Sequence, residues 1–188
     1  MIDRLPQASW RLVVATSALV GFALGSAALD APLQELGTLA CLATGLLYLT
    51  LAVVGIADPP SAWPWPRGAL ATVLLLVGAA HVLFTDGGAD RGWPLLQHVV
   101  TPVLVLADIA WQPGTPGRWW WPLTWALLPA AYFGYHRATE LAVYDALDPF
   151  AGDYGRTLAG LLIGVLVSAL LVYSLERLRQ SAYDRDIS

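Results

Sequence analysis

The chain lacks lysine altogether, has a single cysteine and a single methionine, and only 13% of its 188 residues are charged. Cys41 has no second cysteine for an internal disulfide and lies in an apolar run, so we expect it to fill core space. No group of cysteines and histidines has zinc-site spacing, so neither a metal nor another cofactor is expected. The net charge of −4, without a basic patch, argues against a nucleic-acid partner.

Apolar residues dominate what is present. Hydrophobic residues make up 57% of the chain, and nine tryptophans are spread along it. A water-soluble domain of this length could not bury so much apolar surface. The composition therefore predicts an integral membrane protein.

Long apolar segments alternate with connectors rich in proline, glycine and charge, such as ADPPSAWPWPRG and QPGTPGR. A helix needs about 20 apolar residues to cross a bilayer core of roughly 30 Å. The sequence predicts an all-α fold, in which residues 1–188 form a single polytopic bundle of six transmembrane helices and 176–188 form a cytoplasmic tail with little structure. The expected spans are about 10–29, 34–56, 68–85, 95–111, 119–138 and 155–175.

Arginine positions predict the orientation, because cytoplasmic loops are enriched in positive charge. Both termini are expected in the cytoplasm. Inside would then be Arg4, Arg11, Arg67, Arg118, Arg177, Arg179 and Arg185, and outside Arg91, Arg137 and Arg156. The same orientation gathers tryptophans at the inner interface as an aromatic belt: Trp10, Trp63, Trp65, Trp111 and Trp119 to Trp121.

With that topology, polar side chains from several helices fall at one depth near the outer surface. Ionisable residues within spans are candidates for function. The set comprises Thr38, His81, His98, Tyr132, Tyr135, His136, Arg137 and Glu140. Asp108 lies on nearly the same side of its helix as His98 but about 15 Å deeper, so we expect it to bond within the bundle near the inner interface.

Spacing of three and four residues places six side chains of 119–138 on one expected stripe: Trp125, Leu128, Tyr132, Tyr135, His136 and Thr139. Purely structural roles remain open for each polar residue. The Thr38 hydroxyl could bond to a carbonyl one turn back. The histidines His81 and His136 could pack or anchor at the interface, and the two tyrosines could belong to an aromatic belt.

Three stretches, QHVVTPVLVLADIAW, WALLPAAYFGYHRA and VYDALDPFAGDYGR, occur in an order that resembles the androgen-induced-protein-like family of six-helix membrane proteins, in particular its bacterial branch. The resemblance covers mainly the second half of the chain. The matching positions are His98, Pro102, Asp108, Trp111, Pro129, Tyr132, Arg137, Tyr144, Pro149 and Phe150. The resemblance implies a multi-pass protein of a bacterial inner (plasma) membrane.

Animal members of that family are threonine hydrolases that cleave fatty acid esters of hydroxy fatty acids. By position, the resemblance assigns the nucleophile to Thr38 and the base to His98. We expect a membrane lipid substrate, with Tyr132, Tyr135 or His81 donating to the reacting carbonyl and Arg137 holding a free carboxylate.

Two other classes of protein stay open at this point. A non-catalytic bundle that binds or transports lipid would use the same polar depth without turnover. A small b-type haem protein would use His81 and His98 as axial ligands, although such proteins usually carry two histidine pairs and this chain has three histidines in all.

Overall fold

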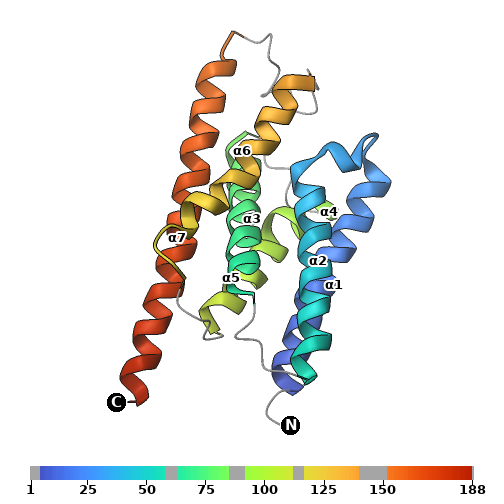
Figure 1. Ribbon diagram of the computed structural model, residues 1–188. Coiled ribbons are helices and arrows are strands. Elements are labelled where there is room, and N and C mark those ends of the chain that lie inside the picture. The colour runs from blue at the N-terminus through green and yellow to red at the C-terminus, as the bar shows by residue number, and fades with distance from the viewer. Residues whose placement is uncertain (1–4, 58–62, 85–91, 112–116, 140–151, 188) are drawn as a thin grey trace.

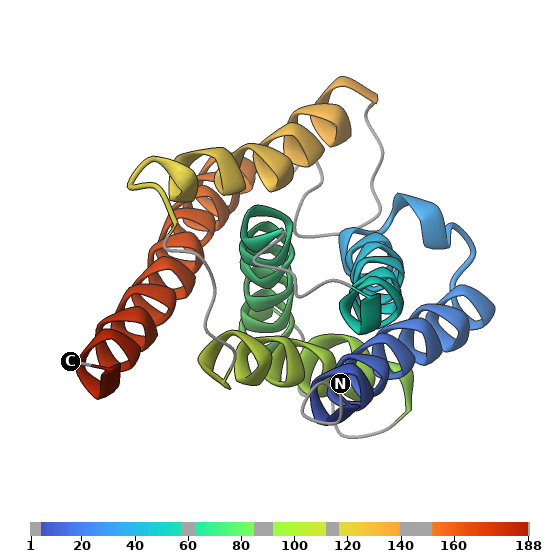
Figure 2. The same ribbon diagram turned by 60° about the horizontal axis from the view of Figure 1, so that its bottom comes forward.

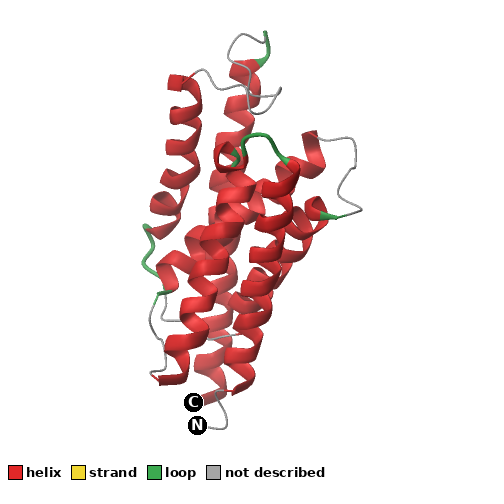
Figure 3. Cartoon of the chain, turned by 90° about the vertical axis from the view of Figure 1, so that its right-hand side faces the viewer, coloured by secondary structure: helices red, strands yellow, loops and turns green. Residues whose placement is uncertain are grey.

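The computed structural model describes residues 5–57, 63–84, 92–111, 117–139 and 152–187. Every regular element among them is helical (Figure 3). The long helices are α1 (Leu5–Ala28), α2 (Leu36–Ala57), α3 (Pro64–Phe84), α5 (Thr101–Trp111), α6 (Trp121–Thr139) and α7 (Tyr154–Ile187). A 3-10 helix, η2 (Pro32–Gln34), precedes α2, and one turn of α4 (Trp93–Leu95) leads through the π-helical segment η4 (Leu96–Val100) into α5.

The predicted all-α membrane class is confirmed in its coarse form. Five stretches of the described chain are long and apolar enough to cross a membrane: Pro6–Ala28, Leu36–Val54, Pro64–Leu83, Trp93–Trp111 and Tyr154–Ala182. The helix expected over 119–138 is present as α6 but is not among these five. The protein is thus a multi-pass helical membrane protein.

Helix α3 is the central element of the bundle and packs against α2, α5, α6 and α7. Figure 1 shows the two termini at the same end, and Figure 2 shows α3 surrounded by its neighbours. The opposite end, called the distal end below, includes the end of α1, η2, the first turn of α2, the last turn of α3, η4, the end of α6 and the start of α7. Helices α1 and α2 pack along each other as an antiparallel pair on one side.

Buried side chains of every size form the main core between these helices, from Val14, Leu74 and Val105 to the large Tyr48 and Trp125. Cys41 is buried in the same cluster, as expected for a residue that fills core space. A second cluster joins α3, α6 and α7 through Leu76, Phe133 and Val165. These contacts fix the helix ends that carry the polar residues.

The segment before Pro102 departs from the regular helix expected over 95–111. Leu96–Val100 forms a π turn that continues directly into α5. A proline inside a helix has no N–H to donate to the carbonyl four residues earlier, and its ring crowds that carbonyl. For Pro102 that carbonyl belongs to His98. The π turn therefore lies where the proline prevents a regular α-helical hydrogen bond.

Helix α7 extends 34 residues, to Ile187. The expectation of little structure after residue 176 is therefore wrong. The sequence ERLRQSAYDRD contains no glycine or proline and is rich in strong helix formers, so the helix continues beyond the apolar part.

Candidate functional site

Thr38 lies in the first turn of α2 and is completely buried. Its hydroxyl oxygen accepts a hydrogen bond from Gln97 Nε2 at 3.4 Å, and the same nitrogen donates to the Gly21 carbonyl oxygen at 3.0 Å. A carbonyl oxygen can only accept, so the amide nitrogen of Gln97 must face it. Thr38 Oγ1 is therefore an acceptor, and its own proton remains available to another group.

His98, the residue after Gln97, lies against α2 at Gly37, which directly precedes Thr38. A Cβ placed on Gly37 would meet His98 Cε1 at 3.3 Å. Since Cε1 lies between the two ring nitrogens, the nitrogen-bearing edge of the imidazole faces α2 at this point. His98 Nδ1 is buried and has no hydrogen-bond partner, which is uncommon for a buried polar atom and calls for an explanation.

The rings of His81 and His98 are stacked, with centroids 4.0 Å apart and planes 3° from parallel. His81 comes from the last turn of α3 and His98 from η4. Trp93 flanks His98 from α4, with ring centroids 6.1 Å apart. The prediction that His81 and His98 share one depth agrees with this contact.

Glycines on three helices allow η4 to approach so closely. On α1, a Cβ at Gly21 would meet Gln97 Cγ at 3.3 Å, and one at Gly25 would overlap Gln97 Nε2. On α3, a Cβ at Gly78 would lie 2.6 Å from the His98 carbonyl oxygen. With Gly37 on α2, four positions without side chains surround the Gln97–His98 pair.

Tyr132 and His136 bring α6 to the distal end. Tyr132 donates to the Gln34 carbonyl oxygen at 2.7 Å and so ties α6 to the chain just before α2. Its ring lies 5.3 Å from that of His136, which is buried. In the same region but outside the spans, burial raises the pKa of Glu35 above its usual value.

Tyr135 and Arg137 are exposed residues of α6. The expected single stripe on this helix is wrong, because Leu128 and Tyr135 are about half exposed while Phe133, one residue beyond Tyr132, is buried. The side chains that α6 buries are Pro122, Trp125, Ala126, Pro129, Phe133 and His136. Glu140, Tyr144, Pro149 and Phe150 lie outside the described residues.

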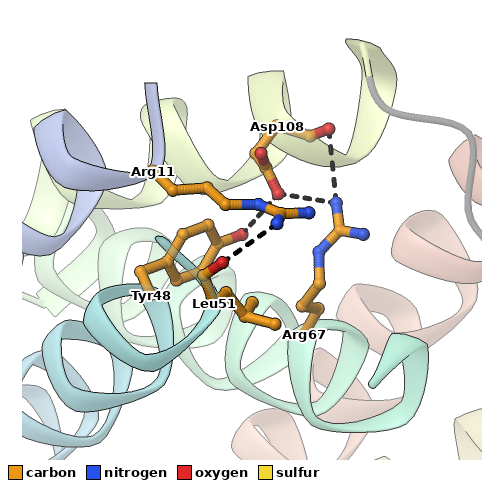
Figure 4. Close-up of polar contacts among 5 residues, drawn as sticks. All are labelled: Arg11, Tyr48, Leu51, Arg67 and Asp108. Carbon is orange, nitrogen blue, oxygen red and sulfur yellow. Dashed lines mark hydrogen bonds and ion pairs between the residues drawn. The ribbon is translucent and has the colours of Figure 1, made fainter. Parts of the chain in front are cut away.

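A second polar cluster is buried in the bundle (Figure 4). Its residues come from the start of α1, the second half of α2, the first turn of α3 and the last turn of α5. Arg67 on α3 forms an ion pair with Asp108 on α5, with Nη2 and Oδ2 2.6 Å apart. Tyr48 donates to the same carboxylate oxygen at 2.9 Å, and Arg11 donates to the Leu51 carbonyl oxygen at 3.2 Å. The expectation that Asp108 bonds within the bundle is confirmed.

The buried roles of Arg11 and Arg67 escaped sequence reasoning, which counted both as interface charges. They are 2% and 6% exposed. Asp108 could have predicted this, because a carboxylate inside a span usually pairs with a cation at its own depth. Gln97 was also missed, since an amide between apolar residues and a histidine gives no spacing pattern.

Among the described residues, no group of three or more histidines, cysteines, aspartates or glutamates is placed to hold a metal ion. Compared with models of known protein families, with curated proteins and with solved structures, the chain matches none. The geometry of the two clusters is thus the basis for an assignment of function.

Proposed function

We propose that the protein is an intramembrane hydrolase of lipid esters, in which Thr38 is the nucleophile and His98 the general base. The observation that carries the proposal is that both residues lie beside the same turn of α2: Thr38 bonds to Gln97, the neighbour of His98, and the His98 ring lies against Gly37, the neighbour of Thr38. His98 Nδ1 has no hydrogen-bond partner in this state, so the proton transfer requires the two side chains to approach each other. The Thr38 hydroxyl accepts from Gln97 and keeps its own proton, and the nitrogen-bearing edge of His98 faces α2 at Gly37. A weak alcohol nucleophile needs such a neighbouring base.

In the proposed reaction, His98 takes the Thr38 proton while Oγ1 attacks the ester carbonyl carbon. The resulting imidazolium then protonates the departing alkoxide, and an acyl-threonine remains. Water attacks this ester with His98 again as base, the fatty acid leaves, and Thr38 regains its proton. The resemblance to the androgen-induced-protein-like family suggests fatty acid esters of hydroxy fatty acids as substrates.

Supporting roles follow from where the other residues lie. His81 is stacked on His98 and would hold its ring in place. Tyr132 donates to a backbone carbonyl at the start of the α2 region. Tyr135 and Arg137 are exposed near the end of α6, where Arg137 would pair with a lipid carboxylate.

The stacking of His81 on His98 argues against the interpretation as a b-type haem protein. Two axial histidines hold a haem plane between them, with one nitrogen of each ring aimed at the iron. The faces of His81 and His98 instead touch each other at 4.0 Å between centroids, which leaves no space for a macrocycle between the rings.

The membrane orientation belongs to the same proposal. Both termini lie at one end of the bundle (Figure 1). This agrees with six spans, in which α6 crosses the membrane together with the five more apolar helical stretches. We place that end in the cytoplasm of a bacterial plasma membrane, so that the Thr38–His98 end faces the outer leaflet.

Hydrolysis of a branched fatty acid ester by the purified protein in detergent tests the proposal. Thr38→Ala and His98→Ala should each lower turnover by at least about 10²-fold, the contribution typical of a general base. Thr44→Ala is the matched control, because Thr44 is an equally buried threonine of α2 whose hydroxyl has no partner. Full activity of Thr38→Ala would refute the assignment, and lipid retained intact without turnover would favour a binding protein.

A further inference from the structure

The hydrolase proposal leaves Gln97 without a role, although its polar side chain is completely buried at the distal end. Gln97 is 0% exposed and lies in the π turn, next to His98. Its amide nitrogen reaches two helices at once, the Gly21 carbonyl of α1 and the Thr38 hydroxyl of α2. Its amide oxygen, Oε1, is buried without a partner.

We propose that Gln97 is a catalytic hydrogen-bond donor to Thr38 Oγ1, which stabilises negative charge on this oxygen both when it attacks and when it later departs. The inference rests on the proposed hydrolase function.

The direction of the hydrogen bond determines the chemistry. Because Nε2 is fixed as a donor by Gly21, it meets the oxygen of Thr38 and not its proton. Donation to an oxygen favours its charged form. As His98 removes the proton, the growing charge on Oγ1 is met by an N–H already in place, which needs no reorganisation.

The same contact serves the second half of the reaction. When water attacks the acyl-threonine, the bond between the carbonyl carbon and Oγ1 breaks, and the electron pair of that bond remains on Oγ1. His98, protonated by the water it activated, returns the proton to this oxygen. A donor at Oγ1 therefore lowers the barrier for acylation and for deacylation.

The backbone is arranged around this amide. The π turn allows consecutive residues, Gln97 and His98, both to reach α2: a Cβ on Gly37 would lie 3.4 Å from Gln97 Oε1 and 3.3 Å from His98 Cε1. Gly21 and Gly25, four residues apart on α1, leave the space that the Gln97 side chain fills. The glycines provide volume for a side chain of this length but do not by themselves require an amide, so the amide itself is the feature to test.

The experiment compares Gln97→Met with the wild-type chain. Methionine keeps the length and volume but cannot donate. We expect kcat for ester hydrolysis and the rate of Thr38 labelling by a fluorophosphonate to fall by about 10²-fold, as on loss of one donor to a reacting oxygen. KM should change by less than about 3-fold, because the donor acts on charge that develops only in the transition state.

A second variant covers the case in which Gln97→Met does not fold. Gly25→Ala forces the amide nitrogen away from its place without changing a residue of the site, and Gly134→Ala, with open space around it, is its control. Gly25→Ala should lower kcat and leave KM, whereas Gly134→Ala should change neither.

If Gln97→Met folds and keeps the wild-type kcat, the role of Gln97 is refuted and the hydrolase proposal stands. If Gln97→Met does not fold, a wild-type kcat in Gly25→Ala has the same meaning. A wild-type chain that neither hydrolyses ester nor reacts with fluorophosphonate would refute the hydrolase proposal itself. A rise in KM, together with a fall in kcat and in the midpoint of thermal unfolding, would show that Gln97 is only a tether between α1 and α2.

Discussion

Gly78 has no side chain at the point where the His98 carbonyl oxygen meets α3. A Cβ there would lie 2.6 Å from that oxygen, so either α3 or η4 would have to move. The widened turn before Pro102 brings this carbonyl to α3, and the glycine leaves space for it. At the scale of single residues, the position of His98 depends on the absence of a side chain at the neighbouring glycines, Gly37 and Gly78.

Gly78→Ala should therefore destabilise the protein and lower hydrolysis together, because the backbone carbonyl cannot give way as a flexible side chain could. We expect a loss of about 1–3 kcal/mol in unfolding free energy, the usual range for overpacking. Thermal unfolding in detergent measures it. Gly134→Ala, which meets nothing within 4 Å, should be neutral or slightly stabilising, and equal behaviour of the two variants would contradict this account.

The sequence predicted the depth of the residues at the distal end better than it predicted the contacts between their side chains. Thr38, His81 and His98 were expected at one depth because depth follows from residue count along a span. The contact of Gln97 with Thr38 was not predicted, because it depends on the π turn and not on regular helical spacing. A turn with one extra residue rotates every following side chain, and helical periodicity alone does not reveal it.

At the scale of elements, η4 and α5 act as one helix whose register changes at Pro102. A proline at this position removes the donor to the His98 carbonyl. The four-residue spacing from His98 to Pro102 thus has a physical reason: the proline favours the widened turn that positions His98.

Pro102→Ala restores that N–H and should let the π turn relax to a regular helix. We expect the chain to stay folded, with an unchanged or higher midpoint of thermal unfolding, and kcat to fall about 10-fold or more as Gln97 and His98 rotate away from α2. Circular dichroism and the ester assay on the same sample measure both effects. Unchanged kcat in a folded Pro102→Ala would show that the turn does not matter for activity.

The buried ion pair joins the first turn of α3 to the last turn of α5. Asp108→Asn keeps the shape of the side chain but leaves Arg67 without its counter-charge, and Tyr48 without its carboxylate acceptor. Breaking a buried pair in this way costs about 3–5 kcal/mol. We expect a large fall in the midpoint of thermal unfolding, and none for Asp153→Asn, an exposed aspartate just before α7. A small effect at Asp108 would mean that water already solvates Arg67.

At the scale of the whole molecule, the termini share one end of the bundle, and the first turn of α2, which contains Thr38, lies toward the other. The arginine count predicted which end faces the cytoplasm. Two of the arginines counted, Arg11 and Arg67, are buried in the bundle, so the bias depends on the remaining ones. Composition determines that helices span the membrane, whereas the partners of buried charges depend on which helices become neighbours.

Labelling of introduced cysteines with a membrane-impermeant maleimide measures the orientation. In a Cys41→Ala background, Gly152→Cys at the distal start of α7 should react in intact cells, because Gly152 is exposed with open space around it. Ser181→Cys, near the other end of α7, should react only after permeabilisation. The reverse pattern would place the termini outside.

The most direct measurement of the central claim is mass spectrometry of the protein after reaction with a fluorophosphonate. The account predicts one adduct per chain, on the peptide that contains Thr38, absent in Thr38→Ala and strongly reduced in His98→Ala. Thr44→Ala should carry the adduct at Thr38 as the wild-type chain does. An adduct on another residue, or an unmodified Thr38 in a chain that hydrolyses ester, would contradict the account.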